Sequence, residues 1–131
     1  MPTLNGEFTL SSWEEKTYAE REGERKLTQA TVTQDLAGDV AGKGQVEWLM
    51  SYGEDGTAHF VGLQQFEGMI DGRQGSVVLE TTGDFDGKEA TWAAKVVEGS
   101  GTGGWAGMSG EGRFQAPHGN KATFTLDYTF D

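Results

Sequence analysis

Alternation of apolar and polar side chains is clearest in the carboxyl-terminal segment of this chain. One parity carries apolar residues and the other carries threonine and aspartate, as Phe124, Leu126 and Tyr128 against Thr125 and Asp127 show. Successive side chains of a β-strand point to opposite faces of the sheet. The period of two therefore predicts a strand over residues 122–130 whose even-numbered side chains face a core.

The same period recurs along most of the chain and predicts roughly eight strands. Asp-Gly pairs separate several consecutive runs, and Asp-Gly suits two-residue hairpin turns because both central residues need a positive φ. We expect a surface loop over the charged residues 20–26, at most a short helical turn in the glycine-rich residues 99–108, and the last turn at residues 118–120. The predicted strands cover residues 7–13, 30–36, 45–52, 58–70, 75–85, 89–97, 110–116 and 122–130, and the Asp-Gly pairs stand at 55–56, 71–72 and 86–87.

Sequential antiparallel strands joined by short turns predict an up-and-down meander. Closing such a meander into a barrel removes the exposed edges that invite aggregation. We therefore expect an all-β fold, a single eight-stranded antiparallel up-and-down β-barrel domain over residues 1–131, with a two-sheet sandwich as the alternative. An eight-stranded barrel is either filled by its own side chains or holds one small ligand.

Composition excludes several classes of partner. Lys and Arg number 10 against 21 Asp and Glu, a formal net charge of -11, and so acidic a chain repels nucleic-acid backbones and anionic lipid surfaces. The absence of cysteine excludes disulfides, zinc-thiolate sites and thiol catalysis. No stretch approaches the roughly 18 apolar residues of a membrane helix, and the amino terminus does not have the pattern of a signal peptide. We expect a cytoplasmic protein with no nucleic-acid and no membrane partner.

Four stretches of the chain resemble a known bacterial family. They are residues 44–52 (GQVEWLMSY), 55–63 (DGTAHFVGL), 72–79 (GRQGSVVL) and 99–112 (GSGTGGWAGMSGEG). Taken in order, they are similar to domain-of-unknown-function family 3224, grouped with the allene oxide cyclase-like barrels, and the resemblance runs from about residue 8 to 130.

The resemblance implies an eight-stranded barrel and says little about activity. Relatives with the same barrel include plant cyclases and dirigent proteins, which bind apolar substrates and steer ring closure or coupling. By fold analogy this implies, if the chain is an enzyme, a cyclase or isomerase without a cofactor. Family members often carry His where this chain has Thr81, so any chemistry of that His would be missing here.

Motifs for cofactors, metals and catalysis are weak. Residues 99–104 satisfy G-x-G-x-x-G, but no strand–helix unit surrounds them, so a tight turn is the better interpretation. Residues 84–89 resemble only part of a calcium loop. We therefore expect no cofactor and no metal. His118 is expected in a solvated turn, whereas His59 begins a strand and is the one candidate base near a barrel mouth, although a partly exposed structural role is the commoner one.

The apolar faces suggest a pocket. Gly62 leaves room between large neighbours, and two amides share the inward parity, each of which needs a hydrogen-bond partner, a water or a ligand. Aromatic walls with a few polar groups are typical of a small-molecule site, and equally of a packed core. The candidate ligand-binding residues are Gln34, Trp48, Tyr52, Gln64, Phe66, Trp92 and Tyr128.

Two hypotheses about function follow. The first is a barrel that binds a small, largely apolar organic molecule in its lumen. The second is a solidly packed, non-catalytic barrel that acts through protein contacts, including a homodimer formed through outward-facing Val61 and Leu63. A cavity large enough for a ligand would separate the two.

Overall fold

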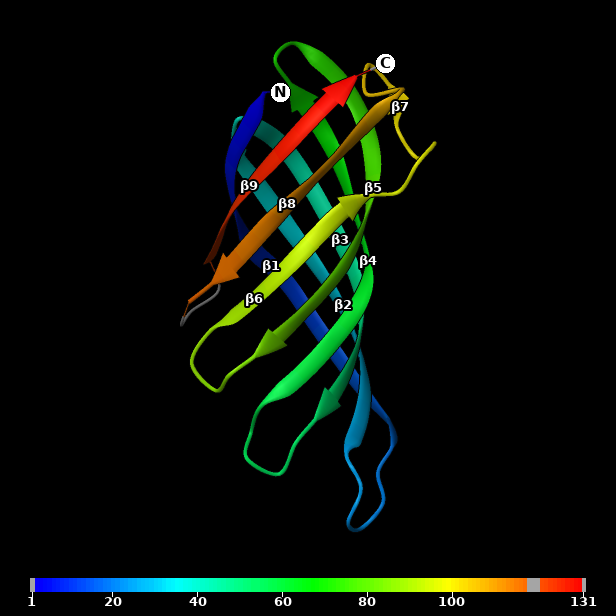
Figure 1. Cartoon of the computed structure of the whole chain (residues 1–131), viewed down its shortest axis with the longest axis vertical. Helices are drawn as coiled ribbons and strands as arrows, with labels where there is room; N and C mark the ends of the chain where they lie inside the picture. Colours follow the sequence, from blue (N-terminus) through cyan, green and yellow to red (C-terminus); the bar gives the residue numbers. More distant parts are fainter. Residues whose placement is uncertain (1, 118–120, 131) are drawn as a thin grey trace.

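The computed structural model describes residues 2–117 and 121–130, and every regular element in this part of the chain is a β-strand (Figure 1). Eight antiparallel strands close into a barrel and one short extra strand lies at its edge, which confirms the predicted fold class. No helix among the described residues is long and apolar enough to cross a membrane. The strands are β1 (Thr3–Ala19), β2 (Lys26–Gly38), β3 (Val40–Tyr52), β4 (Ala58–Ile70), β5 (Arg73–Phe85), β6 (Ala90–Val96), β7 (Thr102–Gly103), β8 (Met108–Ala116) and β9 (Lys121–Phe130).

Each barrel strand pairs with the next barrel strand in the chain, and one further pairing, between β1 and β9, closes the sheet. The order β4-β3-β2-β1-β9-β8-β6-β5 is joined into a ring by the β4–β5 pair, in register from Ala58↔Phe85 to Ile70↔Arg73. The first and last barrel strands meet through Thr3↔Asp127 and Thr9↔Lys121. Closure leaves no open edge, which excludes the sandwich alternative.

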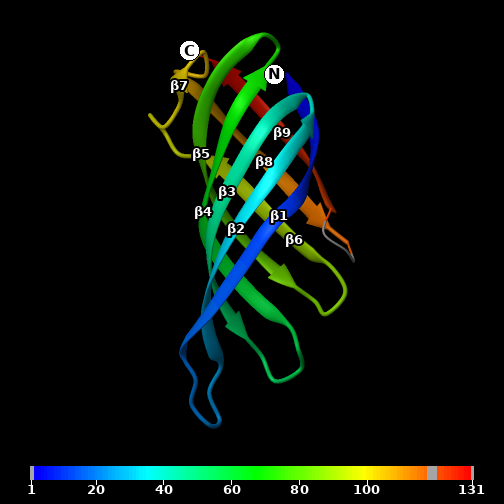
Figure 2. The ribbon, with the colours of Figure 1, turned by 180° about the vertical axis from the view of Figure 1, so that it is seen from behind.

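The two ends of the barrel differ. The open end carries the loops 20–25, 53–57 and 86–89, and beyond it the β1–β2 hairpin extends away from the barrel (Figure 2). The plugged end carries the 71–72 turn, the segment containing β7, and both chain termini (Figure 1). Trp105 is 0% exposed there, and its indole Nε1 donates a hydrogen bond of 2.8 Å to the Arg73 carbonyl.

One of the three Asp-Gly pairs forms the two-residue hairpin turn that was predicted for it, and the other two do not. Asp71 and Gly72 have φ values of 47° and 76° and form the predicted two-residue hairpin turn. The other two Asp-Gly pairs lie in the longer loops 53–57 and 86–89, so the prediction of two-residue turns was wrong there. In each loop the aspartate Oδ1 instead accepts backbone amides that follow it, from Thr57 for Asp55 and from Lys88 and Glu89 for Asp86.

β1 is longer than the sequence predicts and changes parity. Leu4 and Phe8 face the core, but a β-bulge between Leu10 and Ser12 shifts the register against β2, so that Trp13 and Glu15 continue the inward face. The predicted end at residue 13 was too early because the strand continues, with mostly exposed side chains, to Ala19. Residues 20–25 form the predicted surface loop, and Lys26 already belongs to β2.

Residues 99–108 contain β7 and tight four-residue turns rather than a helix. Trp105 N, Ala106 N and Met108 N each donate to the carbonyl three residues earlier. β7 pairs with β5 through Gly75↔Gly103 and Ser76↔Thr102. The predicted last turn at residues 118–120, with His118, lies outside the described residues.

Candidate functional site

A cavity of about 400 Å³ occupies the open end of the barrel. Seven of its fifteen lining residues are aromatic, and most of the others are aliphatic. Lys88 and Pro117 come from loops and the others from strands, so the walls combine seven strands of the ring. The aromatic lining residues are Phe8, Trp13, Trp48, Tyr52, Phe60, Phe85 and Trp92, and the others are Leu10, Met50, Lys88, Ala90, Ala116, Pro117, Lys121 and Ala122.

Three rings form the inner wall of the cavity. Trp48 lies 5.1 Å from Phe60 and 5.2 Å from Trp92 between ring centroids, with the two indole planes at 77°. Trp92 stacks on Phe114 at 5.1 Å and 9°. All four side chains are at most 4% exposed. Edge-to-face and stacked contacts of this kind hold the rings in fixed orientations, so the wall is preformed.

Trp48 owes its position to Thr81 and Gly62. Its indole Nε1 donates to Thr81 Oγ1 at 3.1 Å, and Thr81 Oγ1 donates in turn to the Gly62 carbonyl at 3.1 Å. A Cβ on Gly62 would lie 2.7 Å from Trp48 Cδ1 and 2.0 Å from the Glu47 carbonyl oxygen. Only glycine fits there, which confirms that Gly62 makes room among large neighbours.

A polar network supports the mouth of the cavity. The Glu15 carboxylate accepts hydrogen bonds from Thr28 Oγ1 at 2.6 Å, Tyr52 Oη at 2.6 Å and Trp13 Nε1 at 3.1 Å. Trp13, 43% exposed, is thereby held 6.1 Å from Trp48 between ring centroids. The hairpin thus covers one side of the mouth with an aromatic ring.

The same network shifts two pKa values in opposite directions. Partial burial works to raise the pKa of Glu15, but the hydrogen bonds from Thr28, Tyr52 and Trp13 and the charge of Lys26 bring it below its ordinary value. Burial, together with the bond to the Glu15 carboxylate and its charge, raises the pKa of Tyr52. Glu15 therefore stays ionised and Tyr52 stays protonated near neutral pH, so the pair is suited to holding the mouth together rather than to exchanging protons.

The predicted site residues divide between cavity and core. Trp48, Tyr52 and Trp92 line the cavity. The amides of Gln34 and Gln64 lie deeper, fully buried, with Gln64 Nε2 donating to Gln34 Oε1 at 2.9 Å. They satisfy one another in part, since Gln34 Nε2 and Gln64 Oε1 have no partner among the described residues.

Two further predicted residues lie away from the cavity lining. Phe66 packs in the middle of the barrel at 5.5 Å from Phe124. Tyr128 is half-buried and packs edge to face on Phe130 at 5.5 Å. These two rings belong to the filled part of the lumen, so the barrel is filled over part of its length and open over the rest.

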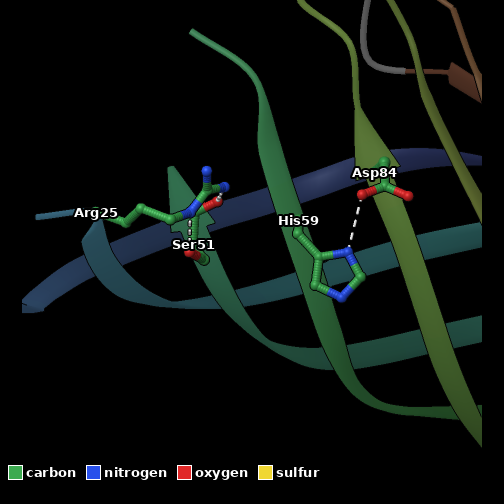
Figure 3. Close-up of polar contacts among 4 residues, drawn as sticks. All are labelled: Arg25, Ser51, His59 and Asp84. Atoms are coloured by element: carbon green, nitrogen blue, oxygen red, sulfur yellow. Dashed lines mark hydrogen bonds and ion pairs between the residues drawn. The ribbon is translucent and has the colours of Figure 1, made fainter. Parts of the chain in front are cut away.

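His59 is on the outer face of β4, not in the cavity. Its Nδ1 lies 2.8 Å from Asp84 Oδ1, and the two side chains are 51% and 73% exposed (Figure 3). On the other side of His59 in the sheet is Ser51, which accepts a 2.6 Å hydrogen bond from Arg25 Nε. Among the described residues His59 therefore has an acid partner that the sequence did not reveal, but it does not face the lumen.

The sequence reasoning missed much of the lining. Phe8 and Phe85 lie in predicted strands, and their inward parity was a usable signal. Trp13 could not be placed, because the bulge before it reverses the parity. Lys88 and Lys121 stand at the mouth beside strand ends, where alternation carries no information.

No cluster of three or more His, Asp or Glu side chains that could hold a metal ion exists among residues 2–117 and 121–130. The G-x-G-x-x-G stretch serves close packing, because Gly101 lies against the Trp105 carbonyl and Gly103 has a φ of 59°. The chemistry of the site thus comes from apolar surface and a few hydrogen-bonding groups.

Fold and site together define a small closed antiparallel β-barrel with an aromatic cavity at one end. A family model described as a protein of unknown function (DUF3224) matches residues 4–128, and the chain belongs to this family. It is similar to the crystal structure of a protein with unknown function from the DUF3224 family of Shewanella oneidensis MR-1, with 25% sequence identity and a TM-score of 0.83 over 100% of this chain and 98% of that one. No curated protein matches the chain.

Proposed function

We propose that this protein binds a small, largely apolar organic molecule in the cavity at the open end of the barrel. The observation that carries the proposal is the cavity itself, about 400 Å³ and lined mainly by aromatic and aliphatic side chains. Small-molecule sites have volumes of roughly 300–1,000 Å³ and this kind of lining. Burial of apolar ligand surface contributes about 2.5 kcal/mol per 100 Å² before the entropic costs of binding are subtracted.

Binding, rather than acid–base turnover, is the activity that the lining supports. Its titratable side chains are Tyr52, Lys88 and Lys121, and the Tyr52 hydroxyl is held by Glu15. A cyclase or isomerase role, which the resemblance to allene oxide cyclase-like barrels suggests, would have to act by folding a reactive substrate and excluding water. His59 would take part only in chemistry on the outer face.

Titration with the neutral fluorophore N-phenyl-1-naphthylamine, read by its emission and by tryptophan quenching, tests the proposal. We expect saturable binding with one site per chain. Ala90→Phe places a ring in the cavity and should weaken binding at least about tenfold by occupying the ligand's volume. Ala93→Phe is the matched control, because Ala93 lies on the same strand with its side chain exposed on the outer face. Absence of saturable binding, or equal effects of the two variants, would refute the proposal.

A second candidate function rests on the outer face of β3 and β4. Leu49, Val61 and Leu63 are 48%, 40% and 56% exposed, and Leu49 pairs directly with Val61 across the two strands. An apolar patch on neighbouring strands favours a protein contact, and we propose a homodimer through it. Sedimentation velocity over a range of concentrations should show a dimer that Val61→Lys abolishes. A monomer at every concentration would eliminate this candidate.

A further inference from the structure

Apart from the Tyr52 hydroxyl, whose proton is donated to Glu15, the polar side-chain groups of the cavity lining are hydrogen-bond donors. Lys88 and Lys121 are the charged side chains of the lining, and both are cationic, although the chain carries 21 acidic residues against 10 basic ones. Lys26, a third cation, lies over the ring of Tyr52 at 5.2 Å. Three lysines from three different loops and strand ends thus surround one opening.

The carboxylates of Glu15 and Asp86, near this opening, already accept hydrogen bonds from other groups of the protein. Glu15 receives three donors, and Asp86 Oδ1 receives the amides of Lys88 and Glu89. Glu7 pairs with Lys121 at 3.1 Å on the outer side of the barrel, while Lys88 has no salt bridge among the described residues. Lys88 is therefore the lysine of the lining that is available to a ligand, because Lys121 is engaged by Glu7 on the outer face.

The buried indole N–H of Trp92 also favours a ligand that carries a hydrogen-bond acceptor. Trp92 is 4% exposed and lines the cavity, yet its indole Nε1 has no hydrogen-bond partner among the described residues. A buried donor without an acceptor is costly, by about 1–3 kcal/mol. An oxygen atom of a bound molecule would satisfy it.

We infer that the ligand is a compact aromatic acid, with its rings between the aromatic walls and its carboxylate beside Lys88. The inference rests on the proposed function and adds to it the ligand's charge and ring character. Flat rings match walls built from seven aromatic side chains, which favour stacked and edge-to-face contacts. The overall net charge of -11 repels anions, so a preference for an acid has to come from the local lysines.

The test uses three ligands that share a naphthalene ring system and differ in charge: 2-naphthoic acid, its neutral amide, and 2-naphthylmethylamine. Each competes with N-phenyl-1-naphthylamine at low ionic strength. We expect the acid to bind about twofold to fivefold more tightly than the amide, which corresponds to one exposed ion pair, and the amine to bind least well. The preference should shrink in salt, because salt screens exposed charges.

Lys88→Gln should remove most of the acid's advantage and leave the affinity for the amide unchanged. Lys95→Gln is the matched control, since Lys95 is exposed on the outer face of β6, away from the cavity. Equal affinities for acid and amide, or a preference for the amine, would overturn the inference about charge while fluorophore binding still supports the proposed function. If the fluorophore itself does not bind, both fail.

Discussion

Thr81 is the residue on which the inner wall of the cavity most depends. It is 1% exposed, accepts the only hydrogen bond of the Trp48 indole found among the described residues, and donates a hydrogen bond to the Gly62 carbonyl. A hydroxyl in this position joins two strands and one aromatic side chain. The orientation of Trp48, and with it the shape of the cavity, therefore depends in part on this buried threonine.

Replacing Thr81 with valine should destabilise the protein by about 1–3 kcal/mol, because the isosteric side chain leaves a buried indole N–H without an acceptor. Ligand affinity should fall as well, since Trp48 loses its anchor. Urea denaturation and fluorophore titration measure the two effects. Thr82→Val, at an exposed position on the same strand, should stay within about 0.5 kcal/mol of the wild type. Similar losses in both variants would show that the hydrogen bond is not responsible.

The buried Gln34–Gln64 pair should behave non-additively. Gln64→Leu removes the partner of a buried amide oxygen and should cost about 1–3 kcal/mol, whereas the double change Gln34→Leu/Gln64→Leu removes both polar groups and should recover much of that loss. A double-mutant cycle from equilibrium unfolding gives the coupling. Strict additivity would mean that the 2.9 Å bond contributes nothing to stability.

At the scale of elements, the β1–β2 hairpin decides how open the cavity is. Its inward face beyond the bulge supplies Trp13 and Glu15, and the Glu15 network ties this face to Thr28 on β2 and Tyr52 on β3. The hairpin extends past the barrel end (Figure 2), where β2 also pairs with β3 as far as Lys26↔Tyr52 and Arg25 donates a hydrogen bond to Ser51. The Glu15 carboxylate thus links the β1 side of the hairpin to β3.

Acid should loosen the base of this hairpin. The pKa of Glu15 is lower in the folded protein than its ordinary value of 4.5, so the network's contribution is present above that value and is lost as pH falls through the lowered one. Acrylamide quenching of tryptophan emission should increase between pH 7 and about pH 3. Glu15→Gln should show the increased quenching already at pH 7.

Glu14→Gln provides the control for this pH effect, because Glu14 is exposed and takes no part in the network. Trp13→Phe should remove the pH-dependent component of the quenching. A response that persists without Trp13 would place the acid-sensitive element elsewhere.

At the scale of the whole molecule, the two ends of the barrel are built differently. The plugged end is closed by Trp105, fully buried and bonded to the Arg73 carbonyl, and the open end holds the cavity. The middle is filled by Phe66, Phe114 and Phe124. This packed layer separates the plugged end from the cavity in which we propose that a ligand binds.

Trp105→Phe should therefore lower stability without changing ligand affinity. The variant leaves the Arg73 carbonyl without its donor, at a cost of about 1–3 kcal/mol. Thermal unfolding should show a lower Tm, while the fluorophore dissociation constant at 25 °C stays within about twofold of the wild-type value. A matching loss of affinity would show that the two ends are coupled through the core.

Strand alternation in the sequence by itself determines most of the architecture. Even parity in β9, β3 and β4 correctly placed Phe124, Trp48 and Phe60 inside. One face of each strand packs in the core and the other contacts water, so apolar and polar residues alternate along the strand. The short turn at residues 71–72 was equally local, since Asp-Gly tolerates positive φ at both positions. Features that depend only on neighbouring residues of the chain, such as strand parity and this turn, can therefore be predicted from the sequence.

Tertiary structure alone decided where the lumen is open. The bulge in β1 reverses parity and brings Trp13 and Glu15 inward, and the staggered closure of the ring places Gln34, Gln64 and Phe66 in the packed middle and Trp48, Tyr52 and Trp92 around the cavity. His59 likewise acquired Asp84 as a partner through the β4–β5 register. Depth along a barrel depends on the tilt and stagger of all strands together, and a period of two along one strand specifies only the face, not the depth.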